Sequence, residues 1–397
     1  MSLAVVPRPA HVPGDLVVDF DFRAPGPPGS DPFVAWSRLI GLPPVVWTPR
    51  NGGHWVVTRG DLVPEVLKDH ARFSSARAFI GPPGRPRGVP LEYDPPEHGP
   101  LRKLLVLAFT PRAVRIWSDE ARKLAVDLIE GFRTRGRCEF VADFAQQLPM
   151  IIFLRIVDLP LDHREKLVRW VNTGLRGRDA GKMAEARASL NRYIGELIDE
   201  RAARPGDDLL SRSIHADIGN GPMTREQAVG LASGLLGGGL DTVAALMGWI
   251  ALFLAGNPAH RADLAADPTR IPKAIEEFMR RFSIANIARV VREDMAFEGA
   301  PLKAGEQILM ASCVHGLDER SFACPFDVDF SRRDAYRHST LSHGIHRCVG
   351  APLATQEILI FIEEWLARIP DFTTDPDDPP VMATGIVHGL ERLVLRW

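Results

Sequence analysis

One long apolar segment, from Arg225 to Ala255, limits the folds open to this chain more than any other feature. Its apolar residues recur with a helical period, and the segment is long enough to cross a membrane. Asp241 lies in its middle, however, and five glycines fall between Gly230 and Gly239, counting both ends. Because a carboxyl group is rare at the centre of a membrane span, we expect a buried helix of a soluble protein instead.

Composition argues against several classes of function. The net charge is −2 at pH 7 and the pI is about 6.6, which gives no general reason to expect nucleic-acid binding. None of the four cysteines belongs to a CxxC pair, so we expect no structural zinc site. The N-terminus has no apolar run long enough for a signal peptide. We therefore expect a cytoplasmic protein with reduced thiols and no membrane association.

The rest of the chain is also predicted to be mainly helical. Helical periods run over residues 101–109, 113–134, 142–157, 163–175, 184–203, 272–282 and 352–369. Short strands are expected at 55–58, at 307–312 and within 381–397, and the Pro- and Gly-rich residues 1–32 should form an extended surface arm. With 45% hydrophobic residues, no repeats and no long linker, residues 1–397 are predicted to form one mainly α domain with small β-sheets (α+β).

A single cysteine near the C-terminal end carries the strongest chemical signal. Cys348 lies between Gly344 and Gly350, and residues 351–354 open the apolar helix pattern behind it. Backbone N–H groups of such a loop and the positive end of the helix dipole stabilise a thiolate. The glycines let the backbone lie flat against a large group. This environment suits a metal ligand or a nucleophile, whereas the other three cysteines are interpreted as structural.

The loop, Leu341-Ser-His-Gly-Ile-His-Arg-Cys-Val-Gly-Ala-Pro-Leu-Ala354, resembles the haem-thiolate loop of the cytochrome P450 family. The resemblance implies that Cys348 is the axial thiolate ligand of the iron of haem b (iron protoporphyrin IX). It also implies the P450 fold, a triangular helical prism with the haem between the long central helix and the cysteine loop. Where the family usually has Phe, seven residues before the cysteine, this chain has Leu341. That change should alter packing beside the sulfur more than ligation itself.

Two polar residues of the long apolar segment give a second signal. The run Gly238-Gly-Leu-Asp-Thr242 places an acid and a hydroxyl where burial is costly without a role. A purely structural explanation is that Thr242 bonds a carbonyl one turn earlier and Asp241 caps a kink. The resemblance instead implies that Gly238 lies against the haem, and that Asp241 and Thr242 deliver protons for cleavage of the O–O bond.

A third motif is Glu277-Phe-Met-Arg280. Glu277 and Arg280 share one helix face and could form an ordinary surface pair. In the family this pair is buried and holds an arginine of the irregular segment before the cysteine loop, which here corresponds to Arg332. Its implied role is structural support of the haem-binding core.

A fourth motif is His98-Gly-Pro-Leu-Arg102. Two basic residues four apart lie on one helix face and suit an anionic group. Together with Arg289 and His346, they match the family positions that bind the two haem propionates.

The similarity extends to the bacterial camphor 5-monooxygenase group, and we take it to cover most of the chain. It includes segments such as Gly316-Leu-Asp-Glu-Arg320 and Trp365-Leu-Ala-Arg-Ile-Pro-Asp-Phe372. The substrate positions differ, because two bulky residues, a valine and an aspartate of the camphor enzyme become the residues at 234, 237, 285 and 287 here. Its ketone-binding tyrosine falls near Pro86. The side chains expected to line a larger, more apolar pocket are Phe79, Gly234, Gly237, Ala285, Ile287 and Val387.

The resemblance implies a monooxygenase that uses O2 and two electrons from a [2Fe–2S] ferredoxin with an NADH-dependent ferredoxin reductase. Arg102, Arg337 and Arg347 should supply positive charge to the docking face, while Thr355 replaces an arginine of the camphor enzyme. We expect a monomer that hydroxylates a hydrophobic terpenoid or norisoprenoid of the ionone type. Camphor itself should bind poorly.

Two alternatives stay open. One is a peroxygenase that uses H2O2 without a redox partner, and the other is a haem-binding sensor or carrier without turnover. The intact Asp241-Thr242 pair argues against both, because neither needs this means of proton delivery.

Overall fold

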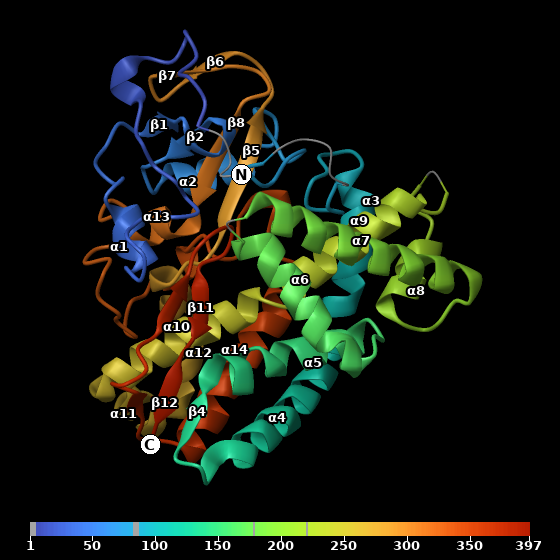
Figure 1. Cartoon of the computed structure of the whole chain (residues 1–397), viewed down its shortest axis with the longest axis vertical. Coiled ribbons are helices and arrows are strands. Elements are labelled where there is room, and N and C mark those ends of the chain that lie inside the picture. Colours follow the sequence, from blue (N-terminus) through green and yellow to red (C-terminus); the bar gives the residue numbers. More distant parts are fainter. Residues whose placement is uncertain (1–4, 82–86, 178, 220) are drawn as a thin grey trace.

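The computed structural model describes residues 5–81, 87–177, 179–219 and 221–397, and most of them are helical. Figure 1 shows β1, β2, β5 and β8 at the upper end of the view, with the long helices below them. The helices are α1 (Pro32–Ser37), α2 (Leu62–Lys68), α3 (His98–Val106), α4 (Pro111–Arg133), α5 (Gln147–Ile156), α6 (Arg164–Arg176), α7 (Ala180–Ala203), α8 (Leu209–His215), α9 (Arg225–Gly239), α10 (Thr242–Gly256), α11 (Pro258–Ala266), α12 (Ile271–Arg281), α13 (Ser312–Leu317) and α14 (Ala351–Arg368).

The strands are short. They are β1 (Val45–Thr48), β2 (His54–Val57), β3 (Phe73–Ser74), β4 (Arg137–Glu139), β5 (Asn286–Val291), β6 (Met295–Phe297), β7 (Ala300–Leu302), β8 (Gln307–Ala311), β9 (Thr373–Thr374), β10 (Val381–Ala383), β11 (Gly389–Arg392) and β12 (Val394–Arg396). The main sheet has the order β1-β2-β8-β5-β3, in which β2 and β8 are parallel and the other pairs antiparallel. Smaller sheets are β4-β12-β9, β10-β11 and β6-β7. The predicted mainly α fold with small sheets is therefore confirmed.

The long apolar segment forms two helices rather than one. α9 ends at Gly239 and α10 begins at Thr242, because Asp241 leaves the helical conformation at φ −127° and ψ −32°. Among the described residues, Arg225–Gly256 is the one helical stretch long and apolar enough to cross a membrane, and 67% of its most apolar 18-residue window is buried inside the protein. The segment thus runs through the core, as its central acid indicates.

The N-terminal arm is extended and runs along the surface, but a few of its side chains enter the core. Apart from a single 3-10 turn at Gly14–Leu16, residues 5–31 form no regular helix, and most of them are exposed or half-buried. Val12, Phe20 and Phe22 are nevertheless buried in the main core. The prolines and glycines predict an irregular arm, but they do not reveal these apolar anchors between them.

Candidate active site

The cysteine loop is held by its own backbone and by α2. The N–H of Cys348 donates to Leu341 O at 2.8 Å, and the N–H of Arg347 donates to Gly344 O at 3.2 Å. Gly344 has a φ of +67°, and a Cβ added there would lie 3.1 Å from the Cα of Lys68. Both the backbone conformation and the lack of space therefore require glycine at this position.

The thiol of Cys348 is accessible and lies among atoms of the surrounding protein. The residue keeps an exposed surface, yet burial by the protein around it raises the pKa of the thiol. The N–H groups of Gly350 and Ala351, where α14 begins, act in the opposite direction and lower that pKa, and Arg102 and Arg347 add to this effect. A bound metal cation would further favour the thiolate.

Three basic side chains converge beside this loop. His98 of α3, His346 and Arg289 of β5 are 4%, 6% and 1% exposed, and the two imidazole centroids lie 4.4 Å apart. Within the described part of the chain, the Nε2 atoms of both histidines and one Nη of Arg289 are buried and have no hydrogen-bond partner. Buried N–H donors of this kind are costly unless a ligand accepts from them.

Near neutral pH Arg289 is charged and His346 is neutral, and the nearby protein acid balances the charge of Arg289 poorly. Burial lowers the pKa of Arg289 to about 10 and that of His346 to about 3, and Arg289 lowers the pKa of His346 further. Asp94 raises both pKa values, but its carboxylate already accepts from Ser74 Oγ at 2.5 Å, the N–H of Ser75 at 2.9 Å and a guanidinium N–H of Arg292 at 2.6 Å. The cluster therefore fits anionic groups, as the haem propionates are.

Arg102 contacts the cysteine loop directly. Its Nη2 donates to Arg347 O at 2.5 Å, and it lowers the pKa of both Cys348 and His98. Arg102 thus links α3 to the loop that carries the cysteine.

The junction of α9 and α10 leaves part of the backbone of the central segment uncovered. Thr242 Oγ1 donates to Gly238 O at 2.7 Å, which is the contact expected on purely structural grounds. A Cβ added at Gly239 would collide with the ring of Phe153, whereas one added at Gly237 or Gly238 would meet nothing within 4 Å. The helix therefore packs tightly on one side and leaves backbone accessible on another.

Strand β5 brings several predicted pocket residues together. Residues 285, 287 and 289 alternate with 286 and 288, so Ala285, Ile287 and Arg289 project to the same side of the strand. Ala285 pairs with Val387 in an antiparallel bridge, and the N–H of Asn286 donates to Ile386 O at 2.9 Å. The apolar residues are thus adjacent to one of the three basic side chains.

Gly234 and Gly230 lie against the 87–89 segment. A Cβ at Gly234 would lie 3.2 Å from Val89 O, and one at Gly230 would collide with Arg87 O. These glycines let the 87–89 segment lie directly on α9. Phe79 is half-buried, and its carbonyl accepts from the Gln307 side chain at 3.1 Å. Pro86 lies outside the described residues.

The sequence analysis missed how the segment before Asp94 is fixed. The Glu92 carboxylate is buried and accepts from the N–H groups of Ala78 and Gly88, each at 2.8 Å. Arg87 lies over the Tyr93 ring, 3.9 Å from its centroid, and its Nε donates to Glu92 O at 2.9 Å. The one signal for this arrangement is an acid and a tyrosine beside a Pro- and Gly-rich loop.

The ion pair of Glu277 and Arg280 in α12 is fully buried. Arg280 Nε lies 2.7 Å from Glu277 Oε2, and Arg332 Nε lies 3.1 Å from the same oxygen. Arg280 also donates to the carbonyls of Gly316 and Pro325, each at 2.7 Å. The structure therefore brings the three predicted residues together and ties α12 to the irregular segment before the cysteine loop.

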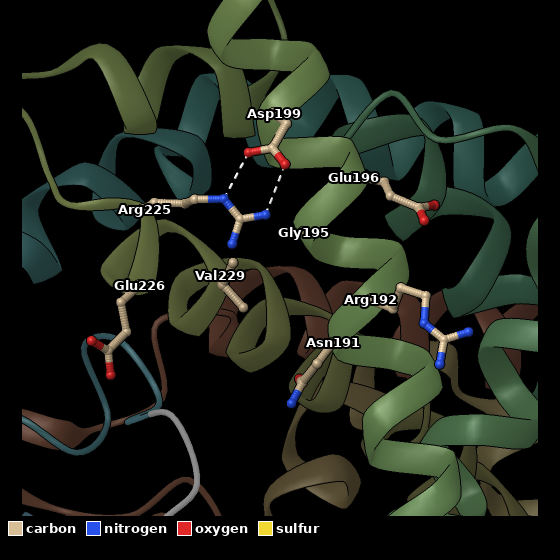
Figure 2. Close-up of a pocket in the computed structure, with 8 residues that line it drawn as sticks. All are labelled: Asn191, Arg192, Gly195, Glu196, Asp199, Arg225, Glu226 and Val229. Atoms are coloured by element: carbon tan, nitrogen blue, oxygen red, sulfur yellow. Dashed lines mark hydrogen bonds and ion pairs between the residues drawn. The ribbon is translucent and has the colours of Figure 1, made fainter.

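Two surface cavities lie away from the central-helix junction. One of about 640 Å³ lies between α7 and α9, and Figure 2 shows Arg225 reaching Asp199 there through two N–O contacts of 2.7 and 2.8 Å. Another of about 420 Å³ lies behind the cysteine loop, where Leu341 borders it with Lys68, His343 and Arg347. Both are lined largely by polar side chains, so neither is the apolar pocket predicted from the sequence.

Comparison with known proteins agrees with this geometry. The family profile of Cytochrome P450 matches residues 153–387. A probable cytochrome P450 127A1 from Sinorhizobium fredii is 35% identical and is aligned over 98% of this chain and 97% of its own length. The mycinamicin IV hydroxylase/epoxidase of Micromonospora griseorubida is 32% identical over 86% of this chain and 85% of its own.

Solved structures agree as well. The crystal structure of CYP101J2 is 38% identical with a TM-score of 0.87, covering 99% of this chain and 100% of its own. That of cytochrome P450 CYP101C1 is 38% identical with a TM-score of 0.89, covering 98% and 100%. These matches agree with the overall fold and with the cysteine loop beside buried basic residues. The chain therefore belongs to the cytochrome P450 family and is a haem-dependent monooxygenase of the bacterial, camphor hydroxylase-like type.

Proposed function

We propose that Cys348 is the axial haem ligand and that His98, Arg289 and His346 hold the propionates. The observation that carries this assignment is the set of buried N–H donors of these three residues, which find no acceptor among the described residues. Haem supplies the oxidising chemistry when bound. The protein contributes a thiolate stabilised by the N–H groups of Gly350 and Ala351.

Proton delivery is assigned to the junction of α9 and α10. Asp241 is 2% exposed and adjoins Thr242, whose hydroxyl donates to Gly238 O at 2.7 Å. A hydroxyl held against a helix carbonyl can exchange that bond for one to a reacting oxygen, and a neighbouring carboxyl can replace the proton given up. Such an arrangement has no use in a sensor or carrier.

The proposed substrate is a hydrophobic terpenoid or norisoprenoid of the ionone type. Ala285, Ile287 and Val387 present apolar surface, and Gly237 of the central segment has open space in front of its backbone. The Arg87 guanidinium lies over the Tyr93 ring, and Tyr93 comes several residues after the position of the camphor enzyme's tyrosine, which supports weak binding of camphor.

The proposed electron donor is a [2Fe–2S] ferredoxin reduced by an NADH-dependent reductase. Arg347 is exposed, and the Arg337 side chain is 57% exposed, beside the cavity behind the cysteine loop. An acidic donor should therefore associate more slowly as ionic strength rises. Electron transfer that is indifferent to salt would contradict this docking face.

The decisive test is the ferrous carbon-monoxide difference spectrum of the purified holoenzyme, followed by titration with β-ionone and camphor. Wild-type protein should give the red-shifted band typical of thiolate ligation, Cys348→Ser should lose it, and Cys324→Ser should keep it. A low- to high-spin shift with β-ionone but not camphor would support the pocket. Product formation with NADH, ferredoxin and reductase, and not with H2O2 alone, would exclude the peroxygenase alternative.

A further inference from the structure

The cavity behind the cysteine loop is lined by basic side chains that the haem chemistry described above does not use. It lies where α2 and α13 meet residues 336–347, and its volume of about 420 Å³ is within the range of small-molecule sites. Among the described residues its lining contains cations, imidazoles and hydroxyls but no carboxylate. These polar residues are Lys68, His315, Tyr336, Arg337, His338, Ser342, His343 and Arg347.

This excess of positive charge is not a property of the surface in general. The chain as a whole has a net charge of −2. In the cavity between α7 and α9, Figure 2 shows acids beside the arginines, namely Glu196, Asp199 and Glu226. A cleft lined by charge of one sign concentrates ions of the opposite sign. The cavity behind the cysteine loop should therefore attract anions, whereas the cavity of mixed charge should not.

The acids closest to Lys68 along the chain do not neutralise it. Glu65 and Asp69 both form ion pairs with Arg72, and the Glu65 contact is 3.0 Å. Within the ranges that the structure describes, no carboxylate oxygen lies within ion-pair distance of Lys68 Nζ, whose residue is exposed at the end of α2. Lysine of this kind is a common point-charge donor to phosphate.

The two arginines of the cavity are also poorly neutralised. Asp334 Oδ2 lies 4.0 Å from Arg337 Nη1, at the outer limit of an ion pair. The carboxylate of Glu276, whose pKa is lowered by His338 and by Arg347, lies 3.2 Å from His338 Nε2 and so pairs with the imidazole. Arg347 has no ion pair of its own with the described acids. Both guanidinium groups therefore keep N–H donors for a ligand.

The imidazoles give the cavity an ordered wall. Ser339 Oγ lies 2.7 Å from His315 Nδ1 and 3.0 Å from His343 Nε2, so that one hydroxyl joins the two rings. Burial lowers the pKa of His343 to about 4, and the charges of Lys68, His338 and Arg347 contribute to this effect. The ring is therefore neutral near pH 7, and the nitrogen not bonded to Ser339 is left for a ligand that lies in the cavity.

We propose that this cavity binds a diphosphate group, either as the free anion or as part of a nucleotide. A single phosphate carries about −1.5 to −2 charges near pH 7, so one phosphate would leave the charge of Lys68, Arg337 and Arg347 partly unbalanced. A diphosphate presents oxygens in several directions, as donors from separate segments require, and each guanidinium can bind two of these oxygens at once.

A bound diphosphate would also affect electron transfer. It would cover Arg337 and Arg347, which belong to the proposed docking face for the ferredoxin, and should slow reduction of the haem by that donor. This consequence rests on the proposed function, whereas binding of the anion does not.

The test is calorimetric titration of the purified holoenzyme with inorganic pyrophosphate, ADP and sulfate at one ionic strength. Wild-type protein should bind pyrophosphate about tenfold or more tightly than sulfate. Lys68→Gln should weaken pyrophosphate binding about tenfold, because a charge-assisted contact is lost. Lys68→Arg should retain most of the affinity, and the exposed control Lys182→Gln should retain all of it. Tighter binding of ADP than of pyrophosphate would identify a nucleotide as the source, and the reverse order would identify the free anion.

Three results would overturn the inference. They are equal affinities for pyrophosphate and sulfate, a pyrophosphate affinity that Lys68→Gln leaves unchanged, and absence of pyrophosphate binding in a protein whose ferredoxin complex is weakened by Lys68→Gln. In the last case the cavity would serve the protein donor instead. If pyrophosphate binds as expected but does not slow reduction by ferredoxin, the diphosphate site stands while the proposed docking face does not.

Discussion

Glu357 is a buried acid whose ionisation opposes folding. It lies in α14 with 3% of its surface exposed, and burial raises the pKa of its carboxyl from 4.5 to about 8. Below pH 4.5 it is protonated in both the folded and the unfolded chain and does not affect stability. Between pH 4.5 and 8 the unfolded chain ionises while the folded one does not, so stability falls by about 1.4 kcal/mol per pH unit.

Glu357→Gln should therefore be more stable than wild-type protein near pH 8, and the difference should shrink as the pH falls toward 4.5. Thermal unfolding measured across this range tests the slope. The exposed control Glu391→Gln should show no such trend. A constant difference at every pH would mean that the carboxyl is not protonated in the folded protein.

Replacement of Thr242 and Asp241 should separate electron uptake from product formation. Thr242→Ala removes the hydroxyl that donates to Gly238 O, so NADH consumption should continue while a much larger share of it yields H2O2. Asp241→Asn should lower the turnover rate by about 10²-fold, a typical loss for a positioned acid. Coupling is measured as the product and H2O2 formed per NADH consumed, and the turnover rate is measured in the same assay. Thr242→Ser is the control that keeps the hydroxyl. Unchanged coupling in Thr242→Ala would contradict the assigned role.

The sequence reveals the importance of some buried polar residues and not of others. Cys348, Asp241 and Thr242 stand out because their chemistry is unusual in a glycine-rich or apolar context. Arg23 and Glu357 do not, because an arginine or a glutamate in a polar stretch gives no sign of burial. Their environments arise only when the arm meets Thr384 and when α14 packs against α4, α10 and α12.

At the scale of elements, the glycines of α9 differ in whether they have room for a side chain. Replacing glycine by alanine inside a helix stabilises the helix by about 1 kcal/mol, and Gly237 has open space to accept a methyl group. At Gly230 the same change meets Arg87 O, and overpacking of this kind costs about 1–3 kcal/mol. Gly237→Ala should raise the melting temperature slightly and Gly230→Ala should lower it. Equal melting temperatures would mean that the 87–89 segment does not rest on α9.

Helix α12 should depend strongly on its buried ion pair. Arg280→Ala would leave Glu277 buried with Arg332 and the N–H of Asp329 as its remaining partners among the described residues, and it would remove the bonds to the carbonyls of Gly316 and Pro325. Loss of one partner of a buried pair costs about 3–5 kcal/mol. The exposed pair of Arg225 and Asp199 provides the control, since Arg225→Ala should cost about 1 kcal/mol or less. Urea unfolding measures the loss of stability in each variant. Similar losses in the two variants would show that burial does not make the α12 ion pair more important for stability than an exposed one.

The elements that could be predicted are those with several turns of apolar periodicity. The patterns for α4, α6, α12 and α14 extend over at least ten residues, and the structure agrees with them. Helices such as α1 and α13 have six residues each, too few to establish a period. The break after α9 follows the glycines and the acid of the central segment, but its position depends on the packing of Gly239 against Phe153.

At the scale of the whole molecule, the N-terminal arm links the two ends of the chain. Its residues Phe20 and Phe22 lie in the same core as β1, β2 and α1, and Thr384 from the C-terminal region bonds to Arg23. The sequence indicated an arm through its prolines and glycines but could not show where it packs, because irregular segments have no period to reveal a buried face.

The arm should therefore contribute to stability as a part of the core. Phe22 is 1% exposed and its ring lies 5.8 Å from that of His54, so Phe22→Ala should cost about 3–5 kcal/mol. Val5→Ala, at a position 58% exposed in the same arm, should change stability by less than about 0.5 kcal/mol. Thermal unfolding of both variants tests the contrast. An arm whose side chains contribute nothing to the core would leave stability unchanged in both variants.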